Sequence, residues 1–340
     1  MSDLQTAQNC LRLEPGPENP RNSEGDFIKL NDGRLLFIYT HFVEGASDHA
    51  DAYLAARESS DGGRTWSGED ALVLPNEEAG MNVMSVSLLR RGDGAIALFY
   101  CRKESLEDCR PRMRISTDEA RTWSEPIDVI PDNEIGYYVL NNDRVIQLER
   151  GPHAGRLIVP VALHKAPDWE EWTSKAHAMC YLSDDGGQTW HRSADVLHPP
   201  TNDAGDLVAL QEPGVVELTD GRVMMFIRTD GGCQYLAFSE DGGEHWTGPA
   251  PSELASPTSP ASIKRIPGTG DLLLVWNDHR NIDEQRADKR TPLSVAISRD
   301  EGQSWQHAKP IFDDPDGWYC YIAIHFEDQR VLLGHVAGRA

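Results

Sequence analysis

The chain has 340 residues, of which 39% are hydrophobic, and its formal net charge at pH 7 is −23. That charge excludes nucleic acid as an expected partner, because an acidic surface repels phosphate groups, and a bound anion would need a local cluster of arginines. No apolar run approaches the roughly 18 residues of a membrane-spanning helix. Since residues 1–6 also carry no secretion signal, we expect a cytoplasmic protein without membrane contact.

The predicted elements are short strands separated by turns, and they begin with a strand near residues 9–13. An Asn-Asp-Gly step at 31–33 is typical of a hairpin turn between antiparallel strands, and Thr-Asp-Gly at 219–221 repeats it. After residue 316 the chain ends in a shorter unit. The clearest strands are 26–30, 34–39, 52–57, 214–218, 222–228, 234–238, 318–326 and 330–335.

One turn motif occurs five times between these strands. Its pattern is Ser-x-Asp-x-Gly-x-Thr-Trp with small variations, and its tryptophans are 57, 67, 56 and 59 residues apart. The Asp can accept hydrogen bonds from backbone N–H groups of its own turn, the Gly permits a positive φ, and the Trp anchors the turn in apolar surroundings. The five copies are residues 59–66, 116–123, 183–190, 239–246 and 298–305.

A regular repeat of this length predicts a radial architecture. Each repeat is a four-stranded antiparallel sheet whose third and fourth strands are joined by the turn motif. The five copies and the segment from Asp316 onward give six repeats, which bury their faces by closing into a ring. We therefore predict an all-β, six-bladed β-propeller. Residues 1–340 would form this single domain, and the N-terminal strand would complete the short last blade.

The five turns resemble the Asp boxes of sialidases and of the wider Asp-box (BNR-repeat) family, and the resemblance covers nearly the whole chain. In that family the boxes lie on the outer rim of the propeller, away from the catalytic face. The motif therefore implies the fold directly and the chemistry only indirectly. The resemblance implies a ligand site where the innermost strands converge at one end of the central channel.

Two segments resemble the sialidase parts that hold a catalytic glutamate and substrate-binding arginines. Residues 211–228 are similar to Asn-Glu-x-x-Val-x-x-Leu-x-Asp-Gly followed by a strand that ends in arginine. By this match Glu212 would activate the nucleophile and Arg228 would bind the substrate carboxylate. Arg290 stands eight residues before the serine of the fifth box, where the family has another such arginine. A guanidinium grips a carboxylate bidentately, which a lysine cannot do.

The segment 318–324 is similar to the Tyr-Ser-x-Leu stretch that carries the nucleophilic tyrosine of sialidases. Tyr319 matches that tyrosine best, and Tyr321 is the alternative nucleophile and a candidate substrate-binding residue. A neutral phenol suits a sugar whose anomeric carbon bears a carboxylate, because an anionic nucleophile would be repelled.

Blade one supplies the remaining candidates and a departure from the family. Asp48, in the loop 11 residues before the first box, would be the general acid and base. Sialidases have a Phe/Tyr-Arg-Ile-Pro motif at the start of this blade, whereas this sequence has Pro-Arg-Asn-Ser-Glu-Gly-Asp-Phe at 20–27. Arg21 is the arginine nearest to that place and would be a third substrate-binding residue. Glu24 occupies the place that Glu212 holds in blade four. Because blade one departs from the sialidase motif, the sequence does not decide which acidic sugar is the substrate.

The leading hypothesis is an exo-acting glycoside hydrolase of the sialidase type, which releases a terminal sialic acid or a related carboxylated sugar with retention. Two alternatives stay open. One is a propeller enzyme that acts on another acidic sugar, a ulosonic or uronic acid, by hydrolysis or elimination. The other is a noncatalytic propeller that binds a glycan or a protein. The sequence shows no metal-binding or phosphate-binding motif, so we expect no metal and no cofactor, and an acidic sugar or glycan as the partner.

Overall fold

The protein is built from β-strands and a few short 3-10 helices in a computed structural model that describes residues 7–76 and 80–339. Residues 1–6, on which the expectation about a secretion signal rests, lie outside the described residues. Within the described ranges, no helix has both the length and the apolar character needed to cross a membrane.

Antiparallel sheets of consecutive strands make up the fold. The first sheet contains β1 (Arg21–Lys29), β2 (Leu35–Phe42), β3 (Ala52–Ser59) and β4 (Ala71–Leu74). A nine-stranded sheet follows, with β5 (Asn82–Arg90), β6 (Ile96–Lys103), β7 (Cys109–Ser116), β8 (Ile127–Asp128), β9 (Tyr137–Val139), β10 (Ile146–Gln147), β11 (Leu157–Lys165), β12 (His177–Ser183) and β13 (His191–Arg192).

Two further four-stranded sheets and a two-stranded sheet complete the chain. They contain β14 (Gln211–Glu217), β15 (Val223–Arg228), β16 (Cys233–Ser239) and β17 (Ala250–Ala255), then β18 (Ser262–Arg265), β19 (Leu272–Asn277), β20 (Leu293–Ser298) and β21 (Gln306–Phe312), and finally β22 (Gly317–Glu327) and β23 (Arg330–Arg339). The short 3-10 helices are η2 (Asp132–Glu134), η3 (Gly151–His153) and η4 (Glu284–Arg286).

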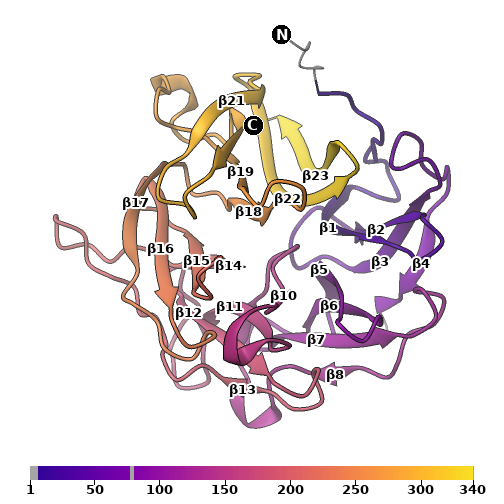
Figure 1. Cartoon of the computed structure of the whole chain (residues 1–340), viewed down its shortest axis with the longest axis horizontal. Coiled ribbons are helices and arrows are strands. Elements are labelled where there is room, and N and C mark those ends of the chain that lie inside the picture. The colour runs from indigo at the N-terminus through magenta and orange to yellow at the C-terminus, as the bar shows by residue number, and fades with distance from the viewer. Residues whose placement is uncertain (1–6, 77–79, 340) are drawn as a thin grey trace.

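The sheets lie around a central axis, with β1, β5, β14, β18 and β22 near the centre and β4, β8, β13, β17 and β21 at the periphery (Figure 1). The predicted all-β architecture of four-stranded antiparallel sheets is therefore confirmed. The count of six blades stays a prediction, because a parallel bridge between Cys109 on β7 and Tyr137 on β9 joins strands 5–13 into one ladder. The hydrogen-bond ladders also do not close the ring.

The N-terminal segment does not add the strand that the sequence predicted. Residues 9–13 have no strand conformation, and the last sheet consists of β22 and β23 alone. Leu11 and Leu13 pack instead against the hydrophobic cluster that contains Tyr39 and Leu332. The segment thus covers apolar surface through side chains. Three prolines between residues 15 and 20 lack the N–H groups that a continuing ladder would need.

The Asp boxes lie between the third and fourth strands of the sheets, at the periphery, as expected from the sequence. In the box at 183–190, Asp185 Oδ1 accepts hydrogen bonds from the hydroxyl of Ser183 at 2.8 Å and from the backbone N–H of Thr189 at 2.9 Å. The other carboxylate oxygen accepts from Thr189 Oγ1 at 2.6 Å. Each box therefore satisfies its own backbone, as the residue pattern predicted.

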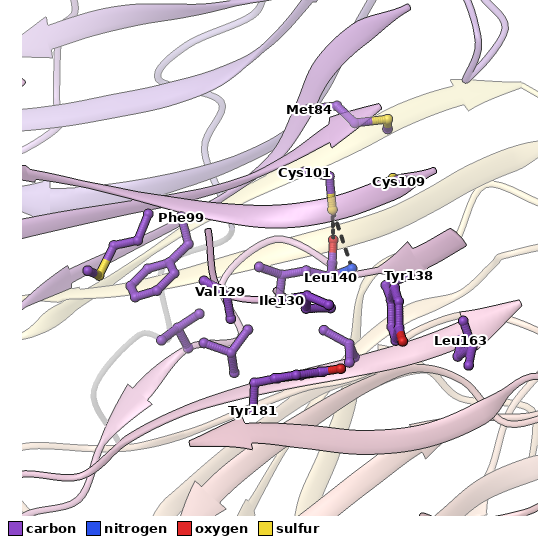
Figure 2. Close-up of a cluster of buried hydrophobic side chains, with 14 of the residues drawn as sticks. Met84, Phe99, Cys101, Cys109, Val129, Ile130, Tyr138, Leu140, Leu163 and Tyr181 are labelled. Atoms are coloured by element: carbon purple, nitrogen blue, oxygen red, sulfur yellow. Dashed lines mark hydrogen bonds between the residues drawn. The ribbon is translucent and has the colours of Figure 1, made fainter. Parts of the chain in front are cut away.

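Hydrophobic side chains from neighbouring sheets pack together and form the core between them. Phe99, Leu140 and Tyr181 are completely buried in one cluster (Figure 2). In the same cluster Cys101 Sγ donates to the backbone O of Leu140 at 3.5 Å and accepts from its N–H at 3.4 Å (Figure 2). Because such cores are close-packed, they hold the inner strands rigidly in place.

Polar side chains link the innermost segments across the centre. Asn142 Nδ2 donates to the backbone O of Gly25 at 2.8 Å and of Tyr321 at 3.2 Å. Arg144 Nη2 donates to the backbone O of Ala261, directly before β18, at 2.8 Å. These buried hydrogen bonds tie β1, β22 and the start of β18 to one short segment, so that the inner strands have fixed relative positions.

Candidate active site

Four inner strands carry a β-bulge with one extra residue, and in each bulge a residue other than glycine has a positive φ. Such a backbone conformation costs about 1–3 kcal/mol, and it concentrates at functional sites because a bulge redirects a side chain. The side chains of the four bulge residues form two hydrogen-bonded pairs. Ser85 Oγ donates to Glu24 at 3.0 Å, and Tyr321 Oη donates to Glu212 at 3.5 Å. The φ angles are 44° at Glu24, 64° at Ser85, 45° at Glu212 and 58° at Tyr321.

Glu212 binds the most partners in this group. Its Oε1 accepts from Arg228 Nη1 at 2.6 Å and from the phenol of Tyr321, and its Oε2 accepts from Asn141 Nδ2 at 3.4 Å. Burial raises the pKa of Glu212, but the charges of Arg228 and Arg290 outweigh burial and hold that pKa below its ordinary value. An ionised carboxylate in contact with a phenol is suited to accept the phenol proton.

Arg290 is a buried guanidinium without a carboxylate partner. It is 8% exposed, and its Cζ lies 4.8 Å from the ring centre of Trp318 and 5.6 Å from that of Tyr321. Among the residues that the structure describes, no Asp or Glu forms an ion pair with Arg290, and its Nε has no hydrogen-bond partner. The Nε of Arg228 also lacks one. A buried charge without a counter-ion is costly, so a bound anion would stabilise Arg290.

The structure places Tyr319 and Tyr321 in different surroundings. The ring of Tyr319 stacks on Phe312 at 5.3 Å and contacts His335 at 6.0 Å. Tyr321 is beside Glu212, and burial raises the pKa of its phenol. The bulge in β22 breaks the strand alternation that would have put the two tyrosines on one face. The fold thus brings Tyr321 to Glu212 and leaves Tyr319, the first sequence candidate for the nucleophile, away from it.

Arg21 and Asp48 form an ion pair with each other. Arg21 Nη2 also lies 3.8 Å from Glu24 Oε2, so Arg21 is engaged by two carboxyl groups. Lys103 Nζ donates to the backbone O of Asp48 at 2.5 Å and holds the loop. Burial raises the pKa of Asp48, but the charge and hydrogen bond of Arg21 outweigh burial and lower it. Asp48 therefore carries a negative charge at neutral pH in this structure.

Glu24 is a buried carboxyl group for which the sequence suggested no role. It is 6% exposed, its Oε1 accepts from Ser85, and its Oε2 has no hydrogen-bond partner. Burial raises the pKa of Glu24 to about 7, despite the opposing charge of Arg21. With Arg21 and Tyr321 it lines a cavity that extends toward β23 and the N-terminal segment. The group is thus neutral or ionised depending on pH within the physiological range.

A regular spacing in the sequence marks these bulges, and it was recognised at Glu24 and Glu212, whereas Ser85 was missed. Glu24, Ser85 and Glu212 each stand nine residues before the glycine of the following hairpin turn. The turn glycines themselves have positive φ values of 88°, 87° and 87° at Gly33, Gly94 and Gly221. Alignment of the repeats on this glycine would have identified Ser85. Nothing in the sequence around Asn141 indicated its contact with Glu212.

The side chains at this site are suited to an acidic ligand that also carries polar groups. Arg21, Arg228 and Arg290 supply guanidinium groups, and carboxyl and phenol groups lie beside them. Within residues 7–76 and 80–339, no group of three or more His, Cys, Asp or Glu side chains is arranged to hold a metal ion. Guanidinium groups bind carboxylates through paired hydrogen bonds, and the neighbouring groups can bind hydroxyls.

Comparison with known proteins gives a match over most of the chain. Residues 84–330 match the family described as BNR repeat-like domain. A sialidase of Micromonospora viridifaciens is 29% identical over 308 residues, which are 82% of this chain and 44% of that protein. The chain therefore spans less than half the length of this relative.

Solved structures share the fold. A Hadza microbial sialidase, Hz136, has a TM-score of 0.70 at 20% identity, over 90% of this chain and 61% of that one. A leech intramolecular trans-sialidase in complex with 2,7-anhydro-Neu5Ac also has a TM-score of 0.70, at 16% identity, over 98% of this chain and 67% of that one. At these identities the likeness shows the fold alone. Because the family match covers well over half of its length, the chain belongs to the BNR repeat-like domain family.

Proposed function

We propose that the protein is an exo-acting glycoside hydrolase of the sialidase type, which releases a terminal sialic acid or a related carboxylated sugar. The observation that carries this proposal is the buried guanidinium of Arg290, which has no ion pair within the described residues and lies next to the hydrogen-bonded Glu212 and Tyr321. The arginine would bind the sugar carboxylate, and the same contact would place the anomeric carbon beside the phenol. The likeness to sialidases of other organisms supports the reaction class.

The proposed nucleophile is Tyr321. Its Oη attacks the anomeric carbon while Glu212 accepts the phenol proton, and the bond from that carbon to the leaving oxygen breaks. Water then hydrolyses the sugar–tyrosine bond, and Glu212 returns the proton to the phenol. Two displacements at one carbon give retention. A neutral phenol avoids the repulsion that a carboxylate nucleophile would meet at a carbon bearing a carboxylate.

Asp48 is the proposed general acid and base. It protonates the leaving oxygen in the first step and takes a proton from water in the second. In this structure its negative charge is held by Arg21. A bound sugar carboxylate would compete with Asp48 for Arg21. Because the ion pair would then weaken, the pKa of Asp48 would rise, so that Asp48 could be protonated and act as an acid. Arg21 would then contribute to binding together with Arg228 and Arg290.

The test is turnover of an aryl sialoside by matched tyrosine variants. Tyr321→Phe removes the nucleophilic oxygen and keeps the ring, so kcat should fall roughly 10³-fold or more. Tyr319→Phe removes a hydroxyl that lies away from Glu212 and should keep at least about half of the activity, since it takes no part in the reaction. Full activity of Tyr321→Phe, or equal losses in the two variants, would overturn the proposed mechanism.

The substrate is tested separately from the mechanism. The engagement of Arg21 by Asp48 and Glu24 motivates a panel that includes aryl glycosides of ulosonic and uronic acids beside the sialoside. Turnover of the sialoside alone supports a sialidase, and turnover of another acidic sugar alone redirects the proposal to that sugar. Binding of a glycan without turnover of any substrate supports the noncatalytic alternative. Analysis of the product separates hydrolysis from intramolecular transfer.

A further inference from the structure

Glu24 stands on the wall of the site at a position equivalent to that of Glu212. Both are bulge residues with nearly the same φ, 44° and 45°, and both are nine residues before the glycine of a hairpin turn. The two carboxyl groups differ in their partners. Glu212 is hydrogen-bonded to Arg228, whereas Glu24 Oε2 has no hydrogen-bond partner and Arg21 is 3.8 Å away.

The charge of the site depends on the protonation of Glu24. Arg21, Arg228 and Arg290 contribute three positive charges, while Glu212 and Asp48 contribute two negative charges. An ionised Glu24 would make the site more negative by one charge, and it would also repel an anionic sugar directly. A neutral Glu24 avoids that repulsion and adds an O–H donor to the cavity wall.

We infer that Glu24 contacts the substrate as a neutral carboxylic acid and donates a hydrogen bond to an oxygen atom of the bound acidic sugar. Ser85 Oγ donates to Oε1, which leaves Oε2 as the oxygen that carries the proton. No acceptor in the described part of the protein is bonded to Oε2, and the side chain lines the cavity together with Tyr321. The inference rests on the proposed function, because it assumes an acidic sugar in this cavity.

Among the carboxyl groups of the site, Glu24 has the pKa closest to 7. Burial raises its pKa to about 7, whereas the pKa values of Asp48 and Glu212 are lowered. The pKa of Tyr321 is raised, so its phenol stays protonated. The titratable or charged groups that face Glu24 are Arg21 on β1, Asp48 after β2, Cys109 on β7, Tyr137 on β9, Glu212 on β14, and Cys320 and Tyr321 on β22.

The experiment measures binding of N-acetylneuraminic acid by calorimetry between pH 5.5 and 8.5, with Glu24→Gln as the main variant. Glutamine is neutral and keeps a donor, so it imitates the protonated acid. In the wild type, Kd should rise with pH above about 7 and approach a tenfold rise per pH unit, because the neutral fraction falls at that rate. Kd of Glu24→Gln should stay constant within about twofold over the same range.

Two further variants separate the contact from general effects. Glu24→Ala lacks the donor, and its Kd at pH 5.5 should be about tenfold higher than that of the wild type, the cost of one lost hydrogen bond. Glu217→Gln changes another buried glutamate, at the other end of β14, whose carboxylate accepts the N–H groups of Glu149 and Arg150. Its binding profile should follow the wild type.

Turnover of an aryl sialoside, measured in the same preparations, distinguishes the two failures. A wild type that turns over the sialoside but binds the sugar with no pH dependence overturns the role of Glu24 and leaves the proposed function intact. Parallel binding profiles of Glu24→Gln and the wild type overturn that role in the same way. A wild type that neither binds nor turns over the sugar overturns the proposed function and the role of Glu24 with it.

Discussion

The outer Asp boxes and the inner bulges are both repeated features, and they differ in what is repeated. The boxes repeat one set of side chains, and each carboxylate is satisfied within its own turn, as at Asp185. The bulges repeat a backbone conformation with different side chains, Glu24, Ser85, Glu212 and Tyr321. Polar atoms are left without partners there, as at Glu24 Oε2. Polar groups that satisfy one another thus mark the scaffold, whereas bulges that leave buried polar atoms without partners mark the place for a ligand.

The largest expected effect is on activity, at Arg290. Arg290→Ala removes a buried guanidinium that has no ion pair within the described residues, so folding should lose little and the sugar should lose its charged anchor. We expect kcat/KM on an aryl sialoside to fall roughly 10³-fold, the value of a lost bidentate, charge-assisted contact. The melting temperature should stay close to that of the wild type.

Arg280→Ala is the matched control for this change. Arg280 also lies over a tryptophan, 5.6 Å from the ring centre of Trp276, but it is more exposed and is paired with Asp278 at 2.6 Å. Its removal should leave kcat/KM within about threefold, because an exposed ion pair contributes little. Similar losses of activity in both variants would contradict the distinction between Arg290, which has no ion pair within the described residues, and the paired Arg280.

An intermediate effect is expected on stability, with opposite signs at Glu24 and Glu212. The pKa of Glu24, about 7 in the folded protein, lies above its ordinary value of 4.5. The folded protein therefore keeps a proton that the unfolded chain releases, and stability is lost as pH rises from 4.5 to about 7. At pH 8 Glu24→Gln should be more stable than the wild type by up to about 3 kcal/mol. At pH 4.5 the two should be similar.

Glu212→Gln should have the opposite effect in the same denaturant titrations. Its folded pKa is lowered, so the ionised form contributes stability above the ordinary pKa that is lost as pH falls. The variant breaks the ion pair with Arg228 and should be less stable than the wild type at pH 8. A stability gain for Glu212→Gln, or a pH-independent change for Glu24→Gln, would refute the electrostatic contrast between the two bulges.

The sequence predicted the features that depend on local residue patterns. The five boxes predicted the antiparallel sheets. The resemblance of two segments to sialidase motifs led to Glu212, Arg228 and Arg290, which lie close together in the fold. The choice between Tyr319 and Tyr321 depended on a bulge at Tyr321. Its φ is 58°, and no glycine in the sequence indicates a positive φ at this position. Alternation along an unbroken strand would have placed both tyrosines on one face.

The strand expected at residues 9–13 was wrong for a different reason. Leu11 and Leu13 do pack against apolar surface. A hydrophobic pattern, however, does not show whether the backbone of the segment forms hydrogen bonds with a neighbouring strand. The ion pair of Arg21 with Asp48 was also beyond local patterns, because it joins a strand to a loop 27 residues away. Local chemistry was therefore predictable, and long-range pairing was not.

The smallest expected effect is on stability, at the boxes. Asp185→Ala removes the acceptor of four hydrogen bonds, from Ser183, Gln188 and twice from Thr189, on an exposed turn where water replaces part of the loss. We expect a cost of about 1–2 kcal/mol, similar to that of a lost helix cap, and unchanged kcat/KM on an aryl sialoside. Glu240→Gln is the control, since this residue of the next box is exposed and its side chain forms no hydrogen bond or ion pair within the described residues.

The effect of Asp185→Ala should also depend on pH. The hydrogen bonds, above all those from Thr189, hold the pKa of Asp185 at about 2, so its contribution is complete above the ordinary pKa and is lost as pH falls toward 2. The difference in stability between Asp185→Ala and the wild type should therefore shrink in acid, whereas that of Glu24→Gln grows in base. A loss of activity in Asp185→Ala at neutral pH, with the fold intact, would place part of the function on the rim and break the contrast between the two repeated features.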